Sequence, residues 1–147
     1  MISLELAEKL KNAGLIWKPQ KGDNVFLKNL INEWKTEQIV SRVFPHTVQM
    51  NGWGQLHTRQ FKDCLFRPRL DQLLAEIERQ GYWYKQGNAI PIPSCPYKYY
   101  CEIWQTNKSG EELCYHEFAE NSPEEAVGQA LLWILEQEAI KNGNSSI

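Results

Sequence analysis

Residues 122–135, SPEEAVGQALLWIL, predict a helix with well-marked start signals. Ser122 is a favourable N-cap and Pro123 suits the first helical position. Glu125 lies three residues after Ser122, which is the spacing of a capping box. Glu124 and Glu125 in this first turn are also favoured by the positive end of the helix dipole. We therefore expect the last helix of the chain to begin at Pro123.

The middle of this helix is apolar nearly all round. One apolar stripe follows helical spacing through Val127, Ala130, Leu131 and Ile134. Three further apolar residues point in other directions: Leu132, Trp133 and Leu135. Such a helix is either packed on two sides within its own domain or shared with another subunit. We predict self-association, most simply as a homodimer, with contacts made by Ala130, Leu132, Trp133 and Leu135.

Two earlier helices are predicted on either side of a less regular middle region. Residues 3–13 combine a Ser3 cap with one apolar face, and Gly14 can take the left-handed conformation that closes a helix. Residues 68–81 start near a proline and end at Gly81. Their apolar residues follow helical spacing: Leu70, Leu73, Leu74 and Ile77.

Turn signals predict two hairpins. Asn51-Gly52 is the strongest, because a two-residue mirror-type turn needs a positive φ at both central positions. The second turn is placed at Lys108-Ser109, between strands at residues 97–105 and 112–118. This register puts His116 opposite Cys101 on one face of the sheet.

The order of the elements indicates the fold class. Further strands are expected at residues 25–31 and 38–44, and single helices separate runs of strands at irregular spacing. This is not the regular βαβ pattern of a parallel sheet. We predict an α+β fold with a single antiparallel sheet of about four to six strands and three helices packed mainly on one face. One domain should cover residues 1–147, with a frayed tail at 142–147.

Composition sets limits on function. The 147 residues carry a formal charge of −2, a mean hydropathy of −0.53, and no apolar run long enough to span a membrane. Acids near the N-terminus interrupt any signal-like apolar region, so we expect a cytoplasmic protein without a membrane partner. Residues 1–98 have a net charge of +5 and residues 99–147 of −7. Such an asymmetry favours association with a charged partner or with further copies of the chain.

The cysteines are expected to be free thiols, because a reducing cytosol opposes disulfides. A zinc site is the alternative, and it would draw on Cys95, Cys101, Cys114 and His116. Zinc modules usually present two cysteines on a tight turn, and this arrangement lacks such a pair. The sequence therefore predicts no metal and no cofactor.

A basic and aromatic segment, RQFKDCLFRPR at residues 59–69, is the best nucleic-acid signal. Arg59, Lys62, Arg67 and Arg69 could neutralise phosphates while a phenylalanine stacks on an unpaired base. The alternative is that the phenylalanines are core and the bases solvate a strand-to-helix joint. Weak binding of single-stranded nucleic acid is our second functional hypothesis.

Tryptophan and tyrosine, six of each, indicate a further surface, because both are enriched where proteins recognise partners. Four tryptophans border predicted elements and are expected in the core: Trp17, Trp83, Trp104 and Trp133. Trp34 and Trp53 lie by turns and are the better candidates for exposure. Trp53, at the tip of the predicted Asn51-Gly52 hairpin, is the expected anchor for a partner.

Three helical segments carry a resemblance. They are residues 1–15 (MISLELA with AGL), residues 68–78 (PRLDQLLAEIE) and residues 122–133 (SPEEA with ALLW). These segments resemble small proteins of unknown function encoded in prophage and phage regions of Gram-positive bacteria. The resemblance implies a phage-type origin and no activity. Residues 32–66 lie outside it, which leaves open an insertion in that region.

The chain lacks the common enzymatic motifs. We find no P-loop, dinucleotide fingerprint, nucleophile elbow, paired-histidine zinc helix or EF-hand loop in the sequence. We therefore predict a non-enzymatic binding or accessory protein of bacterial or prophage origin. Its expected partner is a second copy of itself or another host or phage protein.

Overall fold

The computed structural model describes residues 1–28, 31–43, 47–52 and 55–144. The chain is α+β and divides into two compact units. Unit 1 comprises Met1–Gly14 and Arg69–Ile147, and unit 2 comprises Leu15–Pro68. Unit 2 is thus inserted in the sequence between the first helix of unit 1 and the rest of that unit. It includes residues 32–66, for which the sequence left open an insertion.

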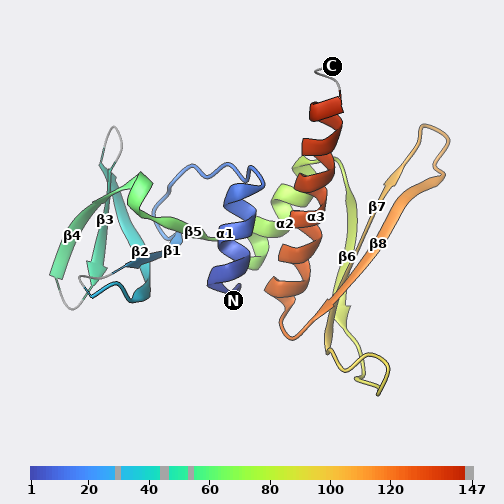
Figure 1. Ribbon diagram of the computed structural model, residues 1–147, viewed down its shortest axis with the longest axis horizontal. Helices are drawn as coiled ribbons and strands as arrows, with labels where there is room; N and C mark the ends of the chain where they lie inside the picture. Colours follow the sequence, from blue (N-terminus) through green and yellow to red (C-terminus); the bar gives the residue numbers. More distant parts are fainter. Residues whose placement is uncertain (29–30, 44–46, 53–54, 145–147) are drawn as a thin grey trace. The chain divides into compact units, whose positions relative to one another are not determined.

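Unit 1 contains three helices and a three-stranded antiparallel sheet (Figure 1). The helices are α1 (Leu4–Asn12), α2 (Leu70–Arg79) and α3 (Pro123–Asn144), and the strands are β6 (Trp83–Asn88), β7 (Tyr99–Thr106) and β8 (Glu112–Glu120). The strand order is β6-β7-β8. Helices α2 and α3 pack on one face of this sheet, and α1 packs against α3.

The predicted helix caps are present, with one difference. Ser3 Oγ accepts a hydrogen bond from the backbone N–H of Leu6 at 3.2 Å, and Ser122 Oγ accepts one from Glu125 at 3.1 Å. The Glu125 carboxylate does not close the capping box by returning to Ser122. It accepts a hydrogen bond from the backbone N–H of Ser3, and so joins the starts of α1 and α3.

Helix α3 is surrounded within unit 1. It contacts α1, α2 and all three strands. Ala130 is fully buried, and Leu132 and Leu135 are only 8% and 6% exposed. Trp133 is half-buried, with its ring 4.0 Å from that of His116 and edge-on to Tyr82 at 6.4 Å. The chain itself therefore covers the apolar residues that suggested self-association through α3, and that argument no longer holds.

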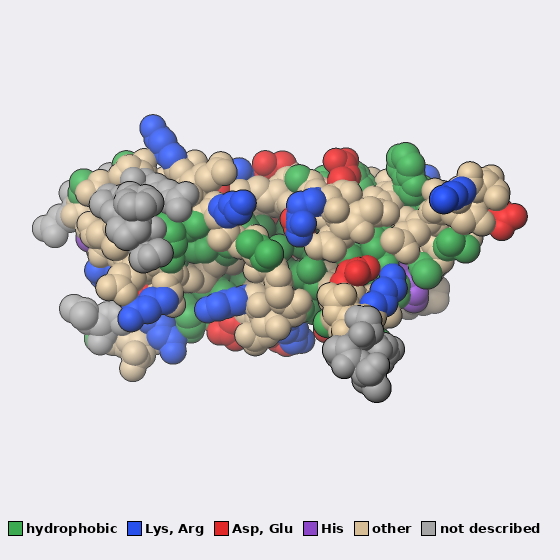
Figure 2. Space-filling model, turned by 90° about the horizontal axis from the view of Figure 1, so that it is seen from above, with side chains coloured by type: hydrophobic (Ala, Val, Ile, Leu, Met, Phe, Trp, Pro, Cys, Tyr) green, Lys and Arg blue, Asp and Glu red, His purple; other side chains and the backbone are tan. Residues whose placement is uncertain are grey.

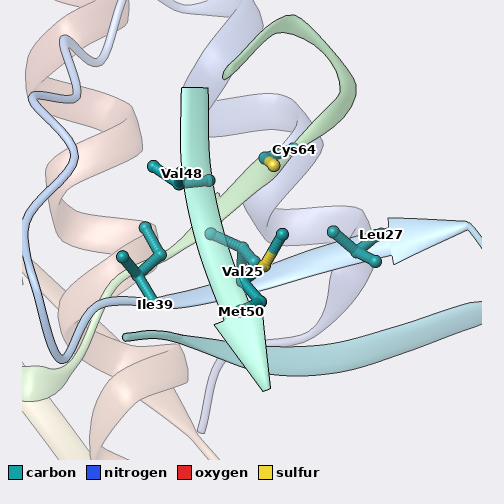
Figure 3. Close-up of a cluster of buried hydrophobic side chains, with 6 residues drawn as sticks. All are labelled: Val25, Leu27, Ile39, Val48, Met50 and Cys64. Carbon is teal, nitrogen blue, oxygen red and sulfur yellow. The ribbon is translucent and has the colours of Figure 1, made fainter. Parts of the chain in front are cut away.

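Unit 2 is a five-stranded antiparallel sheet in the order β4-β3-β2-β1-β5. Its strands are β1 (Asn24–Lys28), β2 (Trp34–Val43), β3 (Thr47–Gly52), β4 (Gln55–Gln60) and β5 (Leu65–Arg67), and a 3-10 turn, η1 (Phe61–Asp63), precedes β5. The buried side chains point toward one another from β1, β2, β3 and the residue after η1 (Figure 3); they are Val25, Leu27, Ile39, Val48, Met50 and Cys64. Strands on both sides of β2 contribute to one cluster, so this core joins the strands of the sheet from β1 to β3.

A buried aspartate fixes the entry to unit 2. Asp23 is 4% exposed, and its carboxylate accepts hydrogen bonds from the Trp17 indole N–H at 2.9 Å and from the Gln20 backbone N–H at 3.0 Å. The Trp17 ring in turn stacks on Phe66 at 5.1 Å. The turn around Pro19 and Gly22 is therefore held by side-chain contacts as well as by its backbone.

Several predictions need correction. The sheet is not single: the strands divide into sheets of five and three. Asn51 and Gly52 pair with Leu56 and Gln55 inside the β3–β4 hairpin, so they are strand residues and not its turn. Helix α3 continues through Asn144, so the first three residues of the expected tail at 142–147 are helical.

Candidate partner-binding surface

The sheet of unit 1 has one face toward the helices and one toward solvent. Cys101 and Ile103 of β7 are fully buried on the helix side. Successive residues of a strand point to opposite faces, so Tyr100, Glu102 and Trp104 lie on the other side. We call this solvent side the outer face of the β6–β8 sheet.

Strand register arranges the outer face in three rows. The pairings give a first row of Trp83, Trp104 and Tyr115, a second of Lys85, Glu102 and Glu117, and a third of Gly87, Tyr100 and Ala119. The register of β7 and β8 shifts between Ile103 and Gln105, so that Trp104 faces both Cys114 and Tyr115. Side chains that are opposite one another have Cβ atoms about 5 Å apart, so the rings of the first row form one continuous surface.

The two outer members of this row are substantially exposed, whereas Trp104 between them is partly buried. Trp83 is 60% and Tyr115 is 46% exposed. The Trp83 indole N–H donates to Thr106 Oγ1 at 3.2 Å, which keeps the ring on the sheet surface. Tyr100 lies over Gly87, since a Cβ at that glycine would be 3.1 Å from the tyrosine hydroxyl. Figure 2 shows hydrophobic side chains at the surface among charged ones over the end of the view that β7 and β8 occupy.

Carboxylates adjoin the aromatic row. Glu102 accepts a hydrogen bond from Tyr115, and this bond, with neighbouring Glu117 and Glu112, raises the pKa of the Tyr115 hydroxyl to about 12. Tyr115 is therefore a neutral donor at physiological pH. With Lys85 as the one base in its middle row, the outer face has a net negative charge.

A cavity of about 520 Å³ lies where α2 leads into β6. It is lined by Glu78, Gly81, Tyr82, Trp83 and Tyr84. The Tyr84 hydroxyl donates a hydrogen bond to the Glu78 carboxylate, and burial together with this carboxylate raises the pKa of Tyr84. Gly81 has a φ of +85°, a conformation that glycine takes readily, and this turns the chain from α2 into the strand. Trp83 belongs both to the cavity and to the outer face.

Most of the partner-binding residues predicted on α3 are not at the surface. The α3 residues Ala130, Leu132 and Leu135 are buried, as described above. Trp53 lies outside the described residues.

The residues proposed for nucleic acid are divided between the two units. Arg59 and Lys62 are exposed in unit 2, whereas Arg69 belongs to unit 1 and pairs with Asp71 at 3.2 Å. The Arg67 guanidinium donates to Thr36 at 2.7 Å and lies 4.7 Å from the centre of the Phe26 ring. The nearby phenylalanines also have partners in unit 2, because both Phe61 and Phe66 contact Trp17. This supports the alternative in which the rings are packing residues.

The alternative zinc ligands are not brought together. In the described ranges, no group of three or more His, Cys, Asp or Glu side chains could hold a metal ion. His116 pairs with Ile103 and not with Cys101 as predicted, and Cys101 is buried opposite Phe118. Burial raises the pKa of the Cys101 thiol to about 12 and that of Cys64 to about 11, so neither is a thiolate near neutral pH.

His57 has a different environment from the one expected. Its polar neighbours Thr58, Arg59 and Gln60 suggest a solvated loop residue, but it lies on β4 with Nε2 2.8 Å from the Glu37 carboxylate. Its side chain is only 23% exposed. This pair links β4 to β2, and among the residues that the structure describes no third side chain joins it to form a metal site.

Sequence reasoning missed the outer face. It placed Trp83 and Trp104 in the core because they border predicted strands. The alternation that would have corrected this is present: Cys101 and Ile103 are apolar, and Glu102 between them is charged. Trp104 then falls on the same side as Glu102, and its pairing with Trp83 completes the row.

Comparisons with known proteins give no relative. The chain matches no protein-family model, no curated protein and no solved structure. Among the described helices, none is long and apolar enough to cross a membrane.

Proposed function

We propose that this chain is a non-enzymatic binding protein of bacterial or prophage origin that recognises a protein partner through the outer face of its β6–β8 sheet. The observation that carries the proposal is the aromatic row of the outer face, in which Trp83 and Tyr115 are exposed on either side of the partly buried Trp104. Tryptophan and tyrosine are the residues that most often anchor protein interfaces, since they combine a large apolar area with a polar tip. The resemblance of the helical segments to prophage-encoded proteins supports the origin.

The area that a partner could cover on Trp83 and Tyr115 is enough for a modest contribution to binding. At roughly 200 Å² per aromatic side chain, the exposed fractions of Trp83 and Tyr115 leave about 200 Å² of surface to cover. At about 25 cal/mol/Å² this is worth about 5 kcal/mol. Association costs about 4–15 kcal/mol in lost rigid-body freedom. The aromatic row therefore needs polar contacts beside it to hold a partner.

Charge favours a protein over nucleic acid as the partner of this face. The middle row carries two carboxylates and one lysine. Phosphates would meet a net negative field there, whereas nucleic-acid surfaces are usually basic. A basic protein surface is the complementary partner. Unit 2 of a second copy is one such surface, because residues 15–68 carry a net charge of +4.

The test is affinity capture from an extract of the organism's own cells with three baits. They are the wild-type chain, a Trp83→Ser/Tyr115→Ser double variant, and Trp34→Ser as the matched control. Trp34 lies in unit 2 and is 37% exposed, so its loss removes a surface tryptophan elsewhere. Circular dichroism should show that all three baits are folded.

We expect a polypeptide that the wild type and the Trp34 variant capture and that the double variant loses. Light scattering of the purified baits identifies the case in which that polypeptide is a second copy. If the three baits retain the same polypeptides, or retain none, the proposed role of the outer face is wrong.

A further inference from the structure

The cavity between α2 and β6 combines aromatic walls with a carboxylate. Three of its five lining residues are aromatic, namely Tyr82, Trp83 and Tyr84, and Glu78 supplies the charge. Its volume of about 520 Å³ lies in the range of small-ligand sites. Aromatic faces attract cations through the ring quadrupole, and a carboxylate beside them adds an ion pair.

Glu78 is held in place without being neutralised by its own chain. Its carboxylate accepts the Tyr84 hydroxyl, an interaction between neutral and charged groups. The neighbouring Arg79 turns away and pairs with Glu76 through both of its hydrogen bonds. Among the described residues, Glu78 is paired with no lysine or arginine. The negative charge at the cavity is therefore available to a cation from outside.

The phenols of the cavity are neutral, and the Tyr82 ring is held by packing. Tyr82 is 5% exposed and its ring meets Trp133 edge-on, which fixes it against α3. Burial, with Cys114 and Glu138 nearby, raises the pKa of the Tyr82 hydroxyl. Two neutral phenols on the helix side of β6, together with Trp83 and one carboxylate, thus line the cavity, and a cation is the ligand that such a lining favours.

We propose that this cavity receives the guanidinium of an arginine side chain carried by the partner that covers the outer face. The inference rests on the proposed function, and Trp83, which lines both surfaces, connects them. A planar guanidinium stacks on aromatic rings and donates two parallel hydrogen bonds to a carboxylate, which an ammonium does not do. Arginine also supplies the polar contact that the aromatic row needs.

The probe is N-acetyl-arginine methylamide, compared with its citrulline analogue, which has nearly the same shape and no charge. The indole N–H resonance of Trp83, assigned with Trp83→Phe, reports binding in ¹⁵N-labelled protein. Because one charge-assisted hydrogen bond is worth about a factor of ten, we expect the arginine probe to bind at least tenfold more tightly than the citrulline probe. Glu78→Gln should abolish that difference. Glu8→Gln removes an equal charge from the exposed side of α1 and should leave it unchanged.

The outcomes separate the two proposals. If the citrulline probe binds as well as the arginine probe, or neither shifts the Trp83 resonance, the cavity does not recognise a guanidinium, while the capture experiment can still support the outer face. If the arginine probe binds through Glu78 but no captured polypeptide depends on Trp83 and Tyr115, the cavity site stands without the partner, and the proposed function fails. A loss of the captured polypeptide on Glu78→Gln supports both.

Discussion

The contact between α1 and α3 depends on a glycine. A methyl group placed at Gly128 of α3 would lie 2.6 Å from Leu6 Cδ2 and 3.7 Å from Ile2 Cγ2. Carbon atoms in contact are about 3.5–4.0 Å apart. Leu6 is only 2% exposed and Ile2 is fully buried, so neither can swing into open space. Gly128→Ala must therefore displace Leu6 within a packed core.

Two opposing effects set the size of this perturbation. Overpacking a core by one methyl group costs about 1–3 kcal/mol. Alanine is better than glycine inside a helix by about 1 kcal/mol. We expect Gly128→Ala to lower the free energy of unfolding of unit 1 by about 0–2 kcal/mol as the difference of these terms. Leu6→Ala alone should lower it by about 2–5 kcal/mol.

The double variant provides the decisive comparison. Once Leu6 is shortened, the clash is removed, and Gly128→Ala should raise the stability by about 1 kcal/mol through helix propensity. The sign of the Gly128→Ala effect is thus expected to reverse, with a coupling energy of about 1–3 kcal/mol.

Urea unfolding followed by circular dichroism at 222 nm measures these effects. The three α-helices found among the described residues lie in unit 1, so the helical signal reports on that unit. The slope against urea should be the same for the four proteins, which shows that the same surface is exposed on unfolding. An effect of Gly128→Ala with equal sign and size in both backgrounds would refute the close contact.

Four further predictions concern other parts of the chain. Asp23→Ala should destabilise unit 2 by about 1–3 kcal/mol, measured by amide exchange in β1, and much of the effect should vanish when Trp17 is already phenylalanine. Cys114→Gly should stabilise unit 1 by about 0.5–1 kcal/mol in urea unfolding, because Cys114 has a φ of +52°. Burial raises the pKa of the Cys101 thiol from 9.0 to about 12, so the neutral thiol contributes fully to the stability of unit 1 below pH 9, and this contribution is lost as the pH rises toward 12. Cys101→Ala should therefore reduce the fall in the free energy of unfolding that is measured between pH 9 and 12. Replacing residues 15–68 by a flexible linker of about ten residues, which spans up to roughly 33 Å, should leave a helical unit 1 with cooperative unfolding, and an unfolded product would mean that both units form one domain.

The helices were predictable because their signals are local. Ser3 and Ser122 act as the caps that the sequence indicates, and Gly14 and Gly81 take the positive φ expected just past α1 and α2. A cap depends on residues within one turn, so no knowledge of the remaining chain is needed.

The division into two sheets was not predictable in the same way. The pattern of a strand does not say which other strand it pairs with. In unit 2, β5 pairs with β1 although the other three strands lie between them in the sequence. The β7–β8 register differs from the predicted one in two steps. The strands leave the turn with Thr106 opposite Glu112, one residue away from the predicted pairing, and the bulge at Cys114 shifts His116 by one residue more, so that it faces Ile103 instead of Cys101. One extra residue in a strand changes the face of every later side chain.

The apolar circumference of α3 has its explanation in the insertion. The element that covers its far side is α1, which unit 2 separates from α2 along the chain; Ser3 and Glu125, which join the two helices, are 122 residues apart. The prediction from the sequence assumed that α3 packs on a sheet with one side only. The apolar residues on its other sides were therefore assigned to a contact with a second copy of the chain. Loop-closure cost rises only with the logarithm of length, so a folded insertion does not prevent α1 from completing the core. Any self-association must then use a surface that remains exposed after α1 has docked, and within unit 1 the row of Trp83 and Tyr115 is such a surface.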